Sequence, residues 1–273
     1  MNDQQFRQLL NRYEFSWTGY RKVRKGVKKR IHRYMKSIEC SNMTAFLAEL
    51  DKNDEVRHQC ELLMTVSISR FFRDRGFWQG LKEHILPEFM DVDRKKIKFW
   101  SAGCACGEEV YSFKIIWTLL SNSYLHVQDL EVLATDINPI YLERARSGIY
   151  PPSSLKEVTK EIQSRYFKQK GGKKLFEVKA SLKKGITWKK HHLLSDPPGS
   201  DFDIIFLRNN VLTYYEKELK KRAFRKVLNC LAPNGFLVIG SHETVPFETE
   251  DLIGVEPYSY VFRKIESRSD CIT

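Results

Sequence analysis

The chain has 273 residues, of which 42% are hydrophobic and 29% are charged, and its formal net charge at pH 7 is +12. This length allows one large domain and one small domain, and the composition excludes a disordered or fibrous protein. No apolar run approaches the roughly 18 residues of a membrane span, and the polar first residues do not form a secretory signal. We expect a cytoplasmic protein without a membrane span.

The cysteines and histidines do not indicate a metal site. The cysteines include no CxxC pair and are too few for a disulfide framework at this length, so we expect reduced thiols. They are Cys40, Cys60, Cys104, Cys106, Cys230 and Cys271. The histidines show neither HxxxH nor HExxH spacing, so we assign none of them to a metal.

The first 70 residues are predicted to form a basic helical domain. Apolar residues recur there at helical spacing in four stretches, the last of them near 54–65. Residues 1–36 carry eleven Lys or Arg against two acids, whereas the remainder of the chain is close to neutral. The run 21–36 has nine basic residues and no acid. Its cationic face is a solvated surface, a surface for an acidic protein helix, or a surface for nucleic acid or anionic lipid.

Residues 71–273 are predicted to form an α/β domain. Apolar runs at 98–103, 130–136, 202–207, 236–240 and 258–264 are predicted strands, and the predicted helices between them are 107–121, 139–147 and 216–231. This alternation predicts a doubly wound, mostly parallel sheet of the Rossmann-like kind with helices on both faces. Residues 151–195 interrupt it. Two β-like runs, 174–180 and 185–191, follow Gly171-Gly172 and predict a short β-hairpin insertion.

Ligands of such sheets bind beyond the carboxyl ends of the strands. The first predicted strand runs into a small-residue turn at Gly103, which allows a ligand close to the backbone, and Glu108 and Glu109 follow it. Two carboxylates disfavour a phosphate and favour a cationic ligand. The alternative is that both acids only stabilise the positive end of a helix.

Polar residues also end the second and third predicted strands. Asp136 is placed to bond the hydroxyls of a ribose, although a helix N-cap is the alternative. Arg208 and Asn209 end the third strand, where buried polar groups need partners and a bound ligand is one candidate. Tyr214 follows, and it either lines a substrate pocket or belongs to the core.

Together these residues resemble the CheR (chemotaxis-receptor) family of protein-glutamate methyltransferases over almost the whole chain. The motifs that carry the resemblance are residues 67–73 (SISRFFR), 100–109, 134–136, 146–150 and 208–209. The resemblance implies S-adenosylmethionine as cofactor, with S-adenosylhomocysteine as product. The implied cofactor site consists of Ser67, Ser69, Arg73, Gly103, Glu108, Glu109, Asp136, His192, Leu193, Arg208 and Asn209.

The resemblance also implies that Arg73 and Tyr214 act at the transferring methyl group, with Glu108 or Glu109 holding the cofactor's ammonium. The chain departs from the family pattern at Ser67 and Ser69, where Asn and Thr are usual, and at His192, where Asn is common. An extra residue after Asn209 leaves open whether Tyr214 or Tyr215 is the active-site tyrosine.

We therefore expect methyl transfer to glutamate carboxylates of an acidic helical protein such as a methyl-accepting chemotaxis receptor. A glutamate with a pKa of about 4.3 is ionised at neutral pH and needs no general base. One alternative is a methyltransferase acting on a small-molecule acid or RNA. Another is an inactive S-adenosylmethionine-binding sensor or adaptor. Residues 196–199 (DPPG) resemble a motif of nucleic-acid methylating enzymes, but they precede the third strand and lack its aromatic ring, so nucleic acid is not the expected partner.

Overall fold

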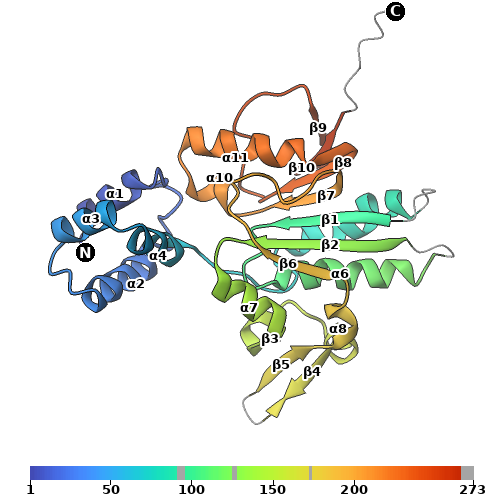
Figure 1. Ribbon diagram of the computed structural model, residues 1–273. Coiled ribbons are helices and arrows are strands. Elements are labelled where there is room, and N and C mark those ends of the chain that lie inside the picture. Colours follow the sequence, from blue (N-terminus) through green and yellow to red (C-terminus); the bar gives the residue numbers. More distant parts are fainter. Residues whose placement is uncertain (91–95, 125–127, 172–173, 266–273) are drawn as a thin grey trace, which may run out of the picture.

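The computed structural model describes residues 1–90, 96–124, 128–171 and 174–265 (Figure 1). Cys271, expected to be a reduced thiol, and Gly172, which precedes the predicted hairpin, lie outside these residues. Within the described ranges, no helix combines the length and the apolar character needed to cross a membrane.

Residues 1–64 form four helices, as predicted. They are α1 (Asp3–Arg12), α2 (Arg24–Ser37), α3 (Met43–Lys52) and α4 (Asp54–Met64). Asn2, Asn42 and Asn53 precede three of them, and each side chain accepts a backbone N–H bond from the first helical turn. Their apolar faces enclose a separate core that includes Phe6 and Phe46. We call this unit the helical bundle.

The larger unit is built on a seven-stranded sheet of order β6-β2-β1-β7-β8-β10-β9. The strands are β1 (Lys96–Ala102), β2 (Asp129–Asp136), β6 (Ile186–Lys190), β7 (Phe202–Leu207), β8 (Leu231–Ile239), β9 (Leu252–Val255) and β10 (Tyr258–Lys264). The first five in spatial order run parallel, and β10 and β9 are antiparallel at one edge. The predicted mostly parallel sheet is therefore confirmed.

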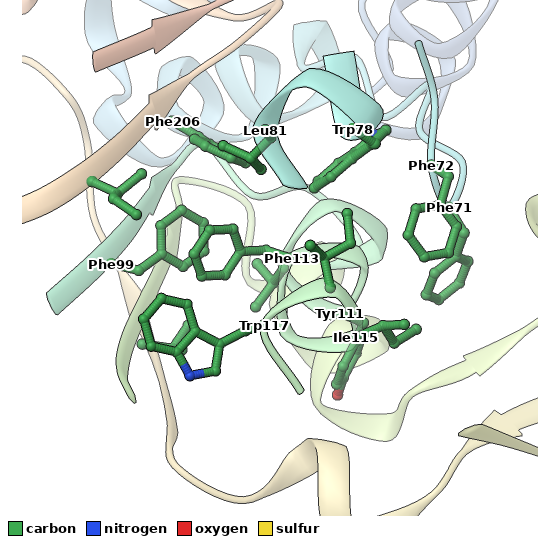
Figure 2. Packing of buried hydrophobic residues seen from close by; sticks show 14 of the residues in the cluster. Phe71, Phe72, Trp78, Leu81, Phe99, Tyr111, Phe113, Ile115, Trp117 and Phe206 are labelled. Carbon is green, nitrogen blue, oxygen red and sulfur yellow. The ribbon is translucent and has the colours of Figure 1, made fainter. Parts of the chain in front are cut away.

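Helices cover both faces of this sheet. They are α5 (Arg75–Gly80), the short turns η1 (Leu81–Ile85) and η2 (Leu86–Phe89), α6 (Glu108–Ser121), α7 (Pro139–Ser147), α10 (Val211–Tyr214) and α11 (Lys217–Asn229). On one face Phe99 stacks on Phe113 of α6 with ring centroids 3.9 Å apart, beside Phe206 (Figure 2). On the other face Trp100 belongs to the core that includes Phe224 of α11. Successive residues of β1 thus face opposite layers, as alternation in a strand requires.

The predicted hairpin is wrong in its pairing. A three-stranded sheet of order β3-β5-β4 does form, from β3 (Ile149–Tyr150), β4 (Phe167–Lys170) and β5 (Leu175–Val178), with η3 (Pro152–Leu155), α8 (Lys160–Tyr166) and α9 (Ala180–Lys183) around it. Residues 186–190 instead join the main sheet as β6, parallel to β2. Ile186 and Trp188 alternate along β6 and pack, partly buried, against the main core.

The helical bundle meets the sheet near the carboxyl ends of the parallel strands (Figure 1). Phe15 and Tyr215 form an isolated antiparallel bridge, and their rings stack with centroids 5.0 Å apart. Two further backbone bonds close the contact, Ser16 N to Tyr214 O at 2.7 Å and Glu216 N to Glu14 O at 2.8 Å. The division into domains at residue 70 stays a prediction.

Candidate active site

A pocket lies between the helical bundle and the carboxyl ends of β1, β2, β6 and β7. It holds about 1140 Å³ of empty space, including its open mouth. The predicted site residues on its walls are Ser69, Arg73, Gly103, Glu109, Asp136, His192, Leu193, Arg208, Asn209 and Tyr214. Ser67 and Glu108 are not on the lining. The strand ends therefore gather most of the predicted side chains at one place, as expected for an open α/β sheet.

The turn after β1 is bonded to the end of β2. The backbone N–H groups of Gly103 and Cys104 both donate to Thr135 O at 2.8 Å. Gly103 has a φ of +85°, and a Cβ there would lie 2.4 Å from the Asn210 amide nitrogen. Only glycine fits this position without strain, so the turn stays open toward the pocket.

Asp136, at the end of β2, also binds the turn that follows β1. Its Oδ2 accepts the N–H of Ala105 at 2.9 Å, and its Oδ1 accepts the N–H of Asn138 at 2.8 Å. Burial raises the pKa of Asp136 to about 6, while these two bonds oppose the rise. The N-cap of α7 is Asn138, whose side chain accepts the N–H of Ile140. The N-cap alternative for Asp136 is thereby removed.

The two glutamates after the turn face different surroundings. Glu109 lines the pocket and accepts bonds from Ser101 Oγ at 3.1 Å and from Arg208 at 3.0 Å. Glu108 is 3% exposed and accepts from Ser154 Oγ at 3.3 Å, while its Oε2 has no partner among the described residues. Burial raises the pKa of both carboxyls. Of the two, Glu109 is the one placed to contact a ligand.

Arg208, at the tip of β7, is held on three sides. Its guanidinium pairs with Glu109 and, at 2.8 Å, with Asp74, and it lies 4.2 Å from the ring centroid of Phe77. The side chain is 4% exposed. A cation this deeply buried requires such partners, so Arg208 organises the wall of the pocket as well as lining it.

Residues 67–73 form the wall opposite the strand ends. The lining residues of this segment are Ile68, Ser69, Arg70 and Arg73. Arg73 donates to Ile68 O at 2.9 Å, and Phe72 N donates to Ser112 Oγ of α6 at 3.0 Å. Ser67 is not on the lining; it is half-buried and close enough to the Cys106 thiol to lower its pKa, against the rise caused by burial. The segment is thus anchored on α6 while its arginines reach the pocket.

The loop after β7 carries Tyr214 and is held by Glu243, which the sequence analysis missed. The Glu243 carboxylate accepts from Asn209 N at 2.9 Å, Gly240 N at 2.7 Å and Thr213 Oγ1 at 2.5 Å. Asp136 is the last residue of β2, whereas Glu243 lies a few residues beyond the end of the buried strand β8. Extending the strand-end rule into the loop after β8 would have included Glu243.

The helical bundle also lines the pocket, and no pattern in the sequence predicts this. Its lining residues are Phe15, Tyr20, Glu61 and Met64, followed by Thr65 and Val66. The segment after α4 is tied to the sheet by Asn138, which donates to Thr65 Oγ1 at 3.0 Å and to Leu62 O at 3.3 Å. Helical periodicity identifies buried faces within a bundle, but not which residues meet a distant strand end.

The residues on the walls fit a nucleoside that also carries a cationic group. Glu109 and Asp136 are acceptor-only when ionised, and they lie beyond neighbouring strands beside an open glycine turn. Such a set suits an ammonium at one carboxylate and ribose hydroxyls at the other. It would repel a phosphate.

Comparisons with known proteins agree with this chemistry. The model of the CheR methyltransferase SAM binding domain matches residues 67–261. The chain is 30% identical over 219 residues to a chemotaxis protein methyltransferase of Listeria monocytogenes serovar 1/2a, covering 80% of this chain and 81% of that protein. It is 32% identical over 206 residues to a probable chemotaxis protein methyltransferase of Rhizobium etli, with coverages of 72% and 76%.

Proposed function

The chain belongs to the CheR family of S-adenosylmethionine-dependent methyltransferases, and we propose that its acceptor is a glutamate side chain of an acidic helical protein, such as a methyl-accepting chemotaxis receptor. One observation carries the choice of acceptor. Arg70 and Arg73 lie on the pocket wall, and neither forms an ion pair with another described residue. Cations on a pocket wall that are not held in an ion pair favour an anionic acceptor.

We propose an orientation for the cofactor along the strand ends. Glu109, after β1, contacts the ammonium of the methionine end, and Asp136, at the end of β2, contacts the ribose. The base then lies at the end of β6, beside His192 and Leu193. The sheet order supports this orientation because β1, β2 and β6 are consecutive neighbours, so a single extended molecule passes the three strand ends in turn.

The reaction needs alignment more than proton transfer. S-adenosylmethionine supplies a methyl group on a sulfonium when it is bound. A glutamate is already ionised at neutral pH, so no residue has to remove a proton. Arg73 orients the acceptor carboxylate, and Arg70 increases its local concentration. The apolar walls, which include Met64 and Trp78, exclude water from the reacting groups.

Tyr214 is our proposed active-site tyrosine. Burial raises its pKa, and the nearby Arg73 charge opposes the rise, so its hydroxyl stays protonated on the side of the pocket that holds Arg73. Tyr215 stacks on Phe15, and its charged neighbours are Glu61 and Asp136, at the nucleoside end. This difference in surroundings supports Tyr214 as the residue near the methyl group.

The exposed face of α2 is our proposed contact for the acceptor helix. Lys25, Lys29 and Arg33 are exposed and have no partner among the described residues. Lys28, by contrast, pairs with Asp3 at 2.7 Å. Arg30 donates to Leu63 O and Thr65 O, at 2.9 and 2.8 Å, and so supports the pocket wall from behind. No residue of 21–36 lines the pocket, which leaves this face available to a partner in the cytoplasm.

Transfer of a radiolabelled methyl group tests the proposal. We expect label on a receptor cytoplasmic fragment that is released by mild alkali, as a glutamyl ester requires. Alkali-stable label on the protein would contradict esterification and indicate N-methylation. Label on a small acid or RNA alone would reassign the acceptor. Tight cofactor binding without turnover on any of these would make the protein a sensor or adaptor.

A further inference from the structure

Glu61, near the end of α4, is the acidic residue among those that the helical bundle places on the pocket lining. Its Oε1 lies 3.2 Å from Nε2 of His192, which follows β6. Its Oε2 lies 3.8 Å from Nδ1 of His58, one turn earlier on α4. Lys190, at the end of β6, has its Nζ 3.3 Å from Nε2 of His58. These contacts join the bundle to the edge strand of the sheet.

The partners of the two imidazoles determine which nitrogens carry protons. Leu194 N donates to His192 Nδ1 at 3.1 Å, so Nδ1 is an acceptor and the proton is on Nε2, which donates to Glu61. The Lys190 ammonium has no acceptor capacity, so His58 Nε2 accepts from it and Nδ1–H faces Glu61. His192 therefore donates a hydrogen bond to the Glu61 carboxylate, and the N–H of His58 faces the same carboxylate at the longer distance of 3.8 Å.

The Glu61 carboxylate lies at the end of the pocket beside β6, where the proposed orientation places the adenine base. Glu61, Ile137, His191 and His192 line the main pocket and also an outer recess beside it, so they form the boundary of the pocket beyond β2 and β6. A carboxylate offers about four lone-pair sites, and two imidazoles leave some of them unused. The Glu61 side chain keeps 22% exposure, so these sites remain accessible to a ligand.

We propose that Glu61 accepts a hydrogen bond from the 6-amino group of the cofactor's adenine. The helical bundle then determines cofactor specificity as well as contacting the acceptor. An amino group at position 6 donates to the carboxylate, whereas the 6-oxo group of hypoxanthine presents an acceptor to it and is repelled. The inference rests on the cofactor orientation proposed above, with the base at the end of β6.

Calorimetric titration with S-adenosylhomocysteine and with S-inosylhomocysteine, its 6-oxo counterpart, tests the inference. Wild-type protein should bind S-adenosylhomocysteine at least about tenfold more tightly than S-inosylhomocysteine, because only the adenine form donates a hydrogen bond to the Glu61 carboxylate. In Glu61→Gln the amide can turn its NH₂ toward a 6-oxo group. We expect weaker binding of the adenine form, stronger binding of the inosine form, and a preference reduced at least about tenfold.

A purely structural role for Glu61 would lower the affinity for both ligands by the same factor, and that result would overturn the inference. Equal binding of the two ligands by wild-type protein would overturn it without any variant, so a Glu61→Gln protein that fails to fold does not block the test. Glu55→Gln is the matched control, because Glu55 lies on the same helix, is exposed and is absent from the lining. Both of its affinities should match wild type.

Asp136→Ala separates this inference from the orientation on which it rests. A ribose contact is common to both ligands, so this variant should weaken both equally and leave the preference unchanged. If Asp136→Ala binds both ligands normally, the proposed orientation is wrong. If it weakens both while Glu61→Gln keeps the wild-type preference, the orientation stands and the role of Glu61 is refuted.

Discussion

Glu109 and Arg208 form an ion pair of 3.0 Å on the pocket wall, and the same guanidinium reaches Asp74 at 2.8 Å. Two acids thus share one arginine, and the group of three keeps one net negative charge when its acids are ionised. The carboxylate proposed for the cofactor's ammonium is therefore held by a buried cation without being fully neutralised by it. This balance suits a cationic ligand.

Replacing Arg208 by alanine should lower the free energy of unfolding by about 3 kcal/mol, because it leaves Glu109 and Asp74 without their buried counterion. Urea unfolding followed by fluorescence measures the change. Arg70→Ala, on the exposed rim of the same pocket, serves as control and should change stability by less than about 0.5 kcal/mol. If Arg208→Ala lowers the free energy of unfolding by less than about 1 kcal/mol, the ion pairs of Arg208 contribute little to the stability of the pocket wall.

Asp136→Ala should weaken cofactor binding about ten- to a hundredfold, because a charge-assisted hydrogen bond to the ribose is worth about 1.5–3 kcal/mol. Calorimetric titration with S-adenosylhomocysteine gives the affinity, and circular dichroism checks the fold. An unchanged affinity in a folded variant would remove Asp136 from the site.

The affinity for S-adenosylhomocysteine should also fall in acid. In the proposed orientation the ionised Asp136 accepts the ribose hydroxyl bonds, and burial raises its pKa to about 6. Affinity is then constant above about pH 7 and decreases as the pH falls below 6, approaching tenfold per unit. In Asp136→Asn, which cannot titrate, this part of the pH dependence should disappear. A variant that keeps the wild-type profile would assign the dependence to another group.

Reversing charge on α2 should impair recognition of the acceptor and not of the cofactor. In Lys29→Glu/Arg33→Glu we expect the acceptor's KM to rise severalfold and its salt dependence to flatten, since complementary charge mainly governs encounter and orientation. The Debye length of about 8 Å at physiological salt confines the effect to the surface. Lys217→Glu/Arg222→Glu on α11 makes the same charge change elsewhere and should leave KM unchanged. An unaltered KM in the α2 variant at low salt would make this face only a solvated one.

The secondary structure was predictable wherever an apolar run had clear ends. Asn138 precedes α7, Pro139 begins it and Gly148 follows it, and the structure places this helix at the predicted residues. The pairing of residues 186–190 was not predictable, because Ile186 and Trp188 alternate equally well in a hairpin and at the edge of a parallel sheet. Choosing between these requires knowing which strand has a free edge, and that is a property of the assembled sheet.

The site was predictable to the extent that its residues follow strands. Gly103, Asp136 and Arg208 meet because parallel strands end at one edge. Ser67 and Glu108 each lie within a residue or two of lining residues, yet neither is on the lining, and spacing alone does not give the direction of a side chain. Glu61 was not predicted as a site residue, because α4 reaches the pocket through contacts between units that are far apart in the sequence.

The bridge between Phe15 and Tyr215 bears on the order in which the molecule forms. Its two strands of backbone are separated by most of the chain, and closing so long a loop is slow, because the entropy is lost before the contact is gained. During synthesis the helical bundle emerges first, but its contribution to the pocket must wait for α10 and the residues that follow it. A nascent chain therefore completes the walls of this pocket only after residue 215 has been synthesised.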